Sequence, residues 1–223
     1  MISIANLVKE NNLKGNYYSP DAYLMGDVET GLLENRQGAR LIAMPEAFVQ
    51  GLYIGLNQEL GQAAGVVLFR CGYRWGKHFY RRFIEEVSTY YNIPVNKMEM
   101  TLFLQCFKEC WKTHGWGYLE LNFDYYQHGF IVANIKNSAF AQSSMGKGEE
   151  PQCFTEAGIL SSFFSQLTGK ELHCVQTECQ TMGAESNYFV IGLEKRVQKA
   201  EAWREEGQDH RTIMDRLKVI QEN

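Results

Sequence analysis

Apolar residues recur at helical spacing in several long segments of the chain. In residues 158–169 the apolar positions share one helical face: Ile159, Leu160, Phe163, Phe164 and Leu167. Gly169 then stands where a helix C-terminus favours a left-handed residue. Similar patterns predict helices over about 61–91 and 96–114, and a further helix that begins at Glu46 after Pro45. We expect the apolar side of that last helix to carry Phe48, Val49, Leu52 and Ile54.

Shorter apolar runs predict the strands of a sheet. Residues 117–123 and 129–135 predict a hairpin, and residues 172–175 and 188–191 flank a turn around Gly183. Residues 40–44 predict an edge strand that ends at Pro45. Because helices alternate with hairpins, the pattern predicts an α+β fold, with an antiparallel sheet and helices packed on one side.

The chain becomes strongly charged from Glu194 onward. Apolar residues still recur there at helical spacing, in two groups: Val197, Ala200 and Trp203, then Ile213, Met214, Leu217 and Ile220. Asp209 is a suitable N-cap for the second of these helices. Helices with an apolar stripe this narrow must pack either on their own domain or on a second chain. Self-docking and a homodimer are therefore both open alternatives.

Composition and charge exclude several classes of protein. The chain has 223 residues, of which 45% are hydrophobic, and a formal net charge of -4, without the basic face that a nucleic-acid partner requires. The N-terminus lacks the pattern of a signal peptide, and no stretch approaches the roughly 18 apolar residues of a membrane span. We therefore expect a cytoplasmic protein that does not bind nucleic acid.

The six cysteines are interpreted as thiols rather than as a disulfide framework. Cys106, Cys110 and His114 follow one another at one-turn intervals, but apolar residues share their face, so core packing is favoured over a metal site. His173 and Cys174 point to opposite faces of a strand and cannot converge with Cys179 on one ion. We expect no metal.

Aromatic residues make up 13% of the chain and concentrate between Tyr73 and Phe130. These rings either line an apolar cavity for a large flat ligand or fill the core. Glu85 and Glu86, beside Arg81 and Arg82, are interpreted as a solvated helical face. No phosphate loop, dinucleotide fingerprint or zincin helix is present, so we assign no catalytic residue and expect a binding protein rather than an enzyme.

Two segments resemble the 4-vinyl reductase domain family, whose domain shares a fold with the small subunits of the TRAPP vesicle-tethering complex. One is residues 158–192, and the other is CGYRWGKHFYRRFIEE at residues 71–86. In the second segment, Gly72 and Gly76 lie on one helical face and admit either a flat ligand or a closely packed helix. Family members often carry a cysteine on each side of the last turn; here Cys179 fills the first position and Asn187 stands at the second. A Cys/Asn pair is a poor ligand set for a soft metal.

The resemblance implies a fold like that of TRAPP subunits and NO-signalling ligand-binding domains. It divides the chain into an N-terminal extension (1–37), a ligand-binding domain (38–193) and a C-terminal helical extension (194–223). It also implies non-enzymatic binding of a hydrophobic ligand, in the first instance a chlorophyll-type or bilin tetrapyrrole. Stand-alone cyanobacterial members of the family point to a carrier or assembly factor for photosystem II, with photosystem assembly proteins as partners and a place peripheral to the thylakoid membrane.

Two alternatives remain open for the function. One is an accessory protein or enzyme in vinyl-tetrapyrrole reduction during chlorophyll biosynthesis. The other is a TRAPP-like scaffold that binds an acyl chain or other proteins. The residues expected to contact the ligand are Cys71, Tyr73, Trp75, Phe79, Phe103, Cys106, Phe107, Cys110, Trp111, Cys174 and Cys179.

Overall fold

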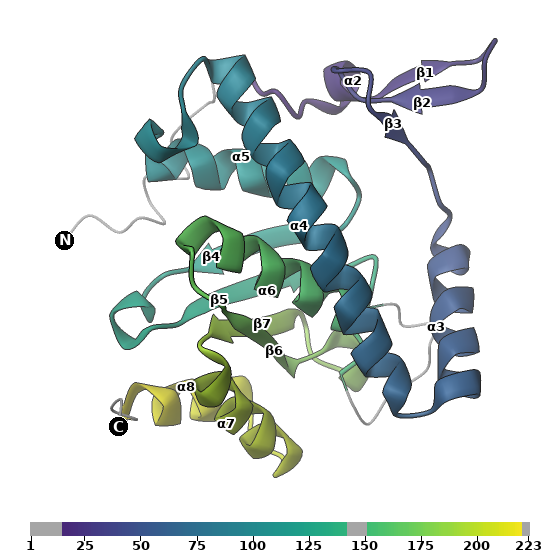
Figure 1. Ribbon diagram of the computed structural model, residues 1–223. Coiled ribbons are helices and arrows are strands. Elements are labelled where there is room, and N and C mark those ends of the chain that lie inside the picture. The colour runs from purple at the N-terminus through teal and green to yellow at the C-terminus, as the bar shows by residue number, and fades with distance from the viewer. Residues whose placement is uncertain (1–14, 142–150, 220–223) are drawn as a thin grey trace.

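The computed structural model describes residues 15–141 and 151–219, which form a sheet between two layers of helices (Figure 1). Long helices form the first layer: α3 (Glu46–Leu60), α4 (Ala63–Tyr91), α5 (Met100–Thr113) and α6 (Phe154–Thr168). The main sheet contains β4 (Tyr118–Asn122), β5 (Ile131–Lys136), β6 (His173–Glu178) and β7 (Asn187–Gly192). The C-terminal helices are α7 (Glu194–Glu205) and α8 (His210–Val219).

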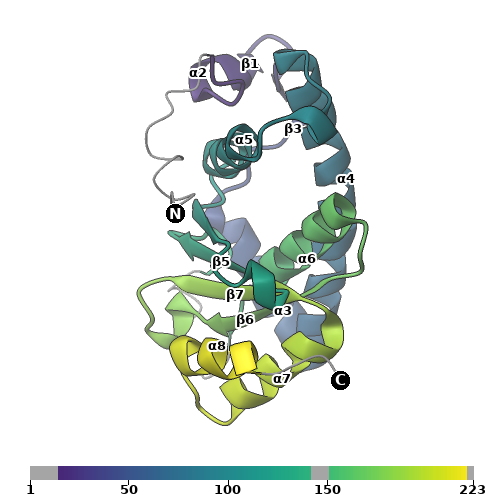
Figure 2. The same cartoon turned by 90° about the vertical axis from the view of Figure 1, so that its left-hand side faces the viewer.

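The main sheet has the strand order β4-β5-β7-β6, and every neighbouring pair is antiparallel. Alternation along the strands divides their side chains between two cores. Ile131, Ala133 and Phe189 belong to the larger core, while Val132 and Val190 belong to a second core with α7 and α8. The predicted α+β class and antiparallel sheet are confirmed, and the C-terminal helices add a layer on the opposite face (Figure 2).

The C-terminal helices dock on their own sheet. The apolar stripe that predicted them is buried there: Val197, Ala200, Ile213, Met214 and Leu217. Of the two alternatives for this stripe, self-docking is the one observed, and Ile220 lies outside the described residues. A homodimer stays a prediction.

The helices α4 and α6 pack at a distance that only glycine allows. A Cβ atom on Gly72 would lie 2.0 Å from the carbonyl oxygen of Thr155, and one on Gly158 would lie 2.2 Å from that of Phe69. Gly76 similarly faces the backbone of Ile159. The glycine pair of the 71–86 segment therefore serves close helix packing, one of its two predicted roles.

Helix α3 differs from its sequence prediction. It begins at Glu46 as expected, but Phe48, Leu52 and Ile54 are 56%, 49% and 47% exposed. The side chain that α3 buries is Tyr53, whose hydroxyl donates to Thr155 Oγ1 at 2.8 Å. Of the four residues predicted on the apolar side, Val49 packs against the larger core, and the prediction was wrong for Phe48, Leu52 and Ile54.

Two other elements are shorter than predicted. Helix α5 begins at Met100 because residues Val95–Lys97 form a separate 3₁₀ turn after Pro94. The edge strand β3 (Arg40–Leu41) contains only two residues and pairs with β2 (Leu32–Glu34), which in turn pairs with β1 (Met25–Asp27).

The N-terminal segment of the described chain packs into the larger core. Tyr17 and Tyr18 precede the short helix α2 (Pro20–Tyr23), and with Tyr23 they are at most 3% exposed. Residues 1–14, 142–150 and 220–223 lie outside those described. Within the described part of the chain, no helix is long and apolar enough to span a bilayer.

Candidate functional site

The structure distributes the predicted ligand-contacting residues over several environments. Cys71 is exposed, Trp75 is 37% exposed and Tyr73 is half-buried. The other eight are buried: Phe79, Phe103, Cys106, Phe107, Cys110, Trp111, Cys174 and Cys179. They do not form one common site.

The buried rings mostly pack against one another. Phe107 stacks on Phe163 with ring centroids 4.2 Å apart, and Phe79 lies 5.5 Å from the same ring. These contacts fill the core between α4, α5 and α6, which is the simpler of the two predicted roles. One polar atom in this region stands out, because the indole Nε1 of buried Trp111 has no hydrogen-bond partner among the described residues.

A groove lies between α4 and the outer strand β6, and we call it the α4–β6 groove. Its inner part has a volume of about 280 Å³ and its outer part about 580 Å³, and Val66, Phe69 and His173 border both. Of the residues expected to contact a ligand, Tyr73 borders the outer part and Cys174 the inner part. The groove is therefore a small-molecule-sized space at which the two sequence anchors of the family resemblance meet.

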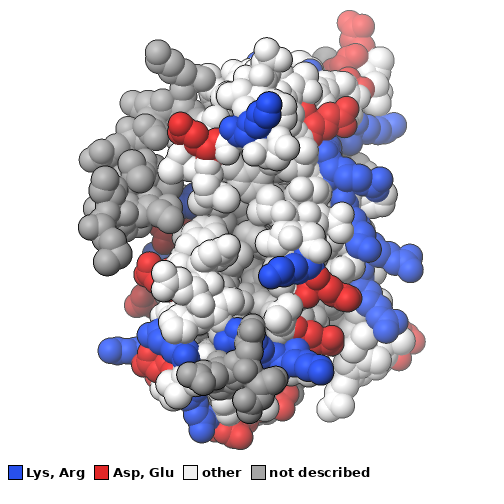
Figure 3. Space-filling view, turned by 60° about the vertical axis from the view of Figure 1, so that its left-hand side comes forward, with Lys and Arg blue, Asp and Glu red and all other residues white. Residues whose placement is uncertain are grey.

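The α4–β6 groove combines apolar walls with a few polar groups. The His173 ring packs against Phe69 with centroids 4.9 Å apart. Burial lowers the pKa of His173, so its imidazole is neutral at pH 7. Arg70 and Arg74 are exposed at the outer rim. They belong to a stripe of basic side chains along α4, at one edge of the molecule (Figure 3).

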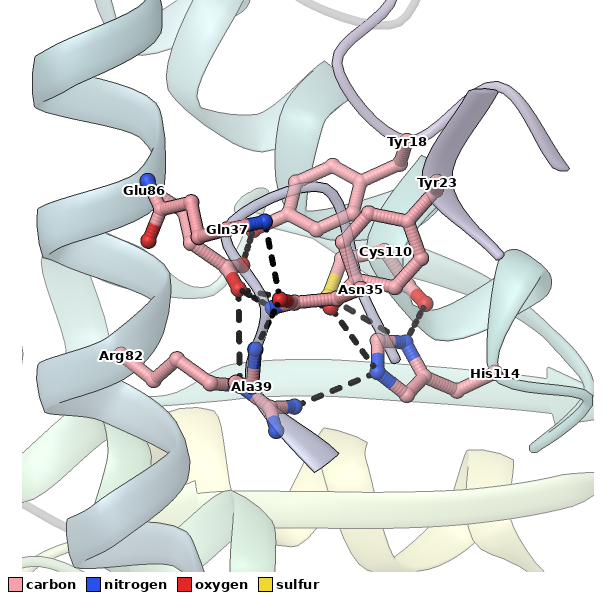
Figure 4. A network of polar contacts seen from close by, with 9 residues as sticks. All are labelled: Tyr18, Tyr23, Asn35, Gln37, Ala39, Arg82, Glu86, Cys110 and His114. Atoms are coloured by element: carbon pink, nitrogen blue, oxygen red, sulfur yellow. Dashed lines mark hydrogen bonds and ion pairs between the residues drawn. The ribbon is translucent and has the colours of Figure 1, made fainter. Parts of the chain in front are cut away.

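A second polar centre lies under the N-terminal segment, around Glu86 (Figure 4). The Glu86 carboxylate is 1% exposed and accepts hydrogen bonds from Tyr18 Oη at 2.9 Å and Asn35 Nδ2 at 2.6 Å. Arg82 Nε lies 3.7 Å from Glu86 Oε1. Burial raises the pKa of Glu86 in spite of these partners. The predicted solvated face was thus wrong for Glu86, because residues 18 and 35 supply donors that its own helix does not.

His114 completes this network (Figure 4). Its Nδ1 lies 2.7 Å from the Cys110 carbonyl oxygen, so Nδ1 carries the proton and Nε2 accepts from Arg82, at 3.2 Å. Burial lowers the pKa of His114 to about 4, which keeps the ring neutral. The network fastens the N-terminal segment to α4 and α5, so its polar groups serve the fold rather than a ligand.

A family model matches the sequence of the sheet region. Residues 131–193 match the model of the 4-vinyl reductase domain, and we call them the family-matched region. This region covers β5, α6, β6 and β7, and the match confirms the resemblance to the 4-vinyl reductase domain family. No curated protein sequence is significantly similar to the chain.

Solved structures extend the comparison beyond the family-matched region. The phenol-responsive sensory domain of the transcription activator PoxR, solved with phenol, has a TM-score of 0.65 and 14% identity; 91% of this chain and 96% of that chain are covered. This similarity shows a shared fold.

Two other solved structures are similar at lower scores. A vinyl-4-reductase family protein from Methanocaldococcus jannaschii has a TM-score of 0.44 and 18% identity, over 70% of this chain and 83% of that one. A trafficking protein particle complex subunit 3 from Naegleria fowleri, covalently bound to palmitic acid, has a TM-score of 0.48 and 11% identity, over 67% and 94%.

The family-matched region also brings together two thiols that sequence reasoning did not connect. Cys153 Sγ lies 3.8 Å from Cys179 Sγ and 3.7 Å from the side-chain oxygen of Asn187. Among the described residues, no three His, Cys, Asp or Glu side chains gather as metal ligands. No local pattern connects Cys153 with Cys179, because 26 residues separate them in the chain.

Proposed function

We propose that this protein binds a hydrophobic small molecule in the α4–β6 groove and holds it without transforming it. The observation that carries the proposal is the groove itself, with Phe69 and Val66 on its walls and the neutral His173 imidazole between its two parts. Binding sites for small molecules are typically apolar concavities with a few placed polar groups. The PoxR sensory domain, which has the same fold, is solved with phenol, and this supports a ligand-binding role.

The specific form of the proposal is a tetrapyrrole carrier. Arg70 and Arg74 stand at the outer rim, where guanidinium groups are suited to the carboxylates of a chlorophyllide or bilin. A neutral imidazole such as that of His173 is the form that ligates a central metal ion. These groups support pigment binding, and the resemblance to the family alone suggests photosystem II assembly as the process that the protein serves.

A specific observation favours a second binding place for a smaller ligand. The Trp111 indole N–H is buried without a hydrogen-bond partner among the described residues. Buried N–H groups in proteins normally donate to an acceptor. The ring of Trp116 lies 5.2 Å from that of Trp111, and His114 lies 4.7 Å from Trp116. A small hydroxylated aromatic molecule would supply the missing acceptor if the rings moved apart.

The test is an absorption spectrum of the protein after incubation with chlorophyllide, haem or biliverdin and desalting. Val66→Asp places a charge on the groove wall, and Val67→Asp is its matched control. Both valines are exposed on α4, 54% and 36%, but only Val66 borders the groove. We expect the wild type to retain a shifted absorption band. Val66→Asp should lower the absorbance of this band at least tenfold, and Val67→Asp should leave it unchanged.

Other outcomes redirect the proposal. Pigment binding that is insensitive to Val66→Asp would exclude the groove. Binding of phenol by calorimetry that is lost in Trp111→Phe, with folding checked by circular dichroism, would place the ligand in the interior instead. A change in the vinyl absorption on adding a reductant would replace the carrier by an enzyme of vinyl reduction. Absence of binding to all these compounds would leave the scaffold alternative.

A further inference from the structure

The two neighbouring thiols of the family-matched region lie at the N-terminal end of α6. Cys153 is the residue immediately before α6, and Cys179 follows the end of β6. Their sulfur atoms are 3.8 Å apart, and both residues are fully buried. A helix N-terminus carries a partial positive charge that favours an anion such as a thiolate.

Donor groups converge on the sulfur of Cys179. The Thr181 hydroxyl lies 3.0 Å from it, and the backbone N–H groups of Gln152 and Thr181 point to it as well. The Cys153 thiol is a further donor. This hydrogen bonding, led by that of Cys153, lowers the pKa of Cys179 to about 5. Burial and the neighbouring sulfur raise the pKa of Cys153, so the pair holds one proton and one negative charge at neutral pH.

The surroundings of the pair add no second negative charge at neutral pH. Two amide side chains border the pair: Gln176 Oε1 accepts from the Cys153 N–H at 3.1 Å, and its Nε2 donates to Asn187 Oδ1 at 3.3 Å. The carboxyl of Glu156 is also close, but burial raises its pKa to about 8, so it is neutral at pH 7. Cys174, the other thiol of this region, has a pKa raised by burial and remains protonated.

The α4–β6 groove gives small molecules a path to the pair. Cys153 borders its inner part together with Gln176 and Cys174. Of the two cysteines, Cys153 is the one that borders this space, and its sulfur lies 3.8 Å from that of Cys179. A disulfide requires a sulfur separation of about 2.05 Å, so the two atoms must approach by about 1.8 Å.

We propose that Cys153 and Cys179 are a peroxide-sensitive thiol pair that closes to an intramolecular disulfide. The proton shared by the two sulfurs moves from Cys153 to Cys179, and the Cys153 thiolate, which borders the groove, attacks one oxygen of hydrogen peroxide. The O–O bond breaks to give a sulfenic acid on Cys153 and hydroxide. The hydroxide takes the proton of the second thiol and leaves as water. The second sulfur, now a thiolate, attacks the sulfenic sulfur, forms the S–S bond and releases hydroxide. Two electrons from the sulfurs thus reduce one peroxide to water and hydroxide.

The bond would join the start of α6 to the turn between β6 and β7. It therefore closes a covalent loop around one side of the groove, independently of whether the groove holds a ligand. The cross-link is measured on the protein without pigment, so failure of this test and failure of pigment binding are distinguishable.

The experiment uses the full chain with Cys71→Ser, which removes the exposed thiol and leaves five cysteines. The reduced protein is treated with hydrogen peroxide, unfolded in the presence of N-ethylmaleimide so that every free thiol is alkylated, and analysed by mass spectrometry. We expect two of the five cysteines to escape alkylation until a reductant is added. Trypsin cuts at Lys170, between the two residues, so the cross-link should join two separate peptides.

Two further variants make the assignment. Cys153→Ser keeps a good N-cap for α6 and should abolish the cross-link. Cys174→Ser removes a buried thiol that borders the same part of the groove and should leave the cross-link intact. Full alkylation of all five cysteines after peroxide, or an equal loss of two thiols in the Cys153 variant, would overturn the proposal.

Discussion

The contact between α4 and α6 makes a sharp prediction about Gly72. A methyl group at this position would meet the Thr155 carbonyl oxygen at 2.0 Å and the Thr155 carbonyl carbon at 2.8 Å. Both are backbone atoms at the start of α6, so no side-chain rotation can make room. To reach an ordinary contact of about 3.4 Å, the two helices must separate by about 1.4 Å.

The expected magnitude follows from two opposing effects. Alanine raises helix propensity over glycine by about 1 kcal/mol. Overpacking of a well-packed interface costs about 1–3 kcal/mol and more where the backbone must move. The shift would also loosen the aromatic packing between Phe79 on α4 and Phe163 on α6. We therefore expect Gly72→Ala to lower the free energy of unfolding by about 2–4 kcal/mol, a large part of the 5–15 kcal/mol of a typical domain.

The measurement is urea unfolding followed by circular dichroism, with Gly51→Ala as the matched control. Gly51 lies inside α3, and a Cβ atom there would meet nothing within 4 Å. The control should gain up to about 1 kcal/mol, because only helix propensity changes. A Gly72→Ala protein as stable as the wild type, in an experiment that detects the gain at Gly51, would refute the close packing of α4 and α6.

Three further predictions concern buried ionisable groups. Glu86→Ala should lower the free energy of unfolding by about 3–5 kcal/mol, because Tyr18 and Asn35 lose their buried acceptor. Glu85→Ala, on the exposed side of α4, should change the free energy of unfolding by less than about 0.5 kcal/mol. Equal effects of the two changes in urea titrations would contradict the hydrogen-bond network around Glu86. Between pH 5 and 8, Glu156 is protonated and Cys179 is deprotonated in the folded protein. In the unfolded chain, the ordinary pKa values of 4.5 and 9.0 make Glu156 deprotonated and Cys179 protonated. Each state therefore holds one proton on these two residues, and together they add no net pH dependence to stability. Glu156→Gln should therefore make stability rise with pH, and Cys179→Ser should make it fall, each by up to about 1.4 kcal/mol per pH unit; parallel pH curves for the three proteins would show that no such exchange of protonation occurs. Finally, the rate of the Cys153–Cys179 cross-link should change little between pH 6 and 8, because the pKa of Cys179 is about 5; a rise of about 100-fold over that range would indicate an ordinary thiol.

Local patterns in the sequence were sufficient for most of the elements. The α6 stripe and its stop at Gly169 were predicted correctly, because the helical period and the left-handed end are properties of neighbouring residues. The β4–β5 and β6–β7 pairs followed from short apolar runs separated by turns. Cys106 and Cys110 were placed correctly in the core from the apolar residues that share their helical face.

The site residues depended on parts of the chain that are far apart. Glu86 looked solvated beside three charged neighbours, yet it is buried because Tyr18, 68 residues away, donates to it. Phe48, Leu52 and Ile54 of α3 are exposed, whereas Tyr53 is the residue of this helix that is buried. No local pattern carries this information, since burial of a charge or an apolar face is decided by what another segment brings to it.

The sequence by itself therefore determined the class of fold, the helices, the main strand pairs and the resemblance to the 4-vinyl reductase domain, because periodicity, turns and motifs are written in adjacent residues. The tertiary structure alone decided which face of α4 is covered, where the α4–β6 groove opens, and that Cys153 meets Cys179 across 26 residues. The physical reason is that side-chain environment is a property of contacts between distant segments. The acidity of a thiol or the charge of a buried carboxyl is set by those contacts and not by the residue type.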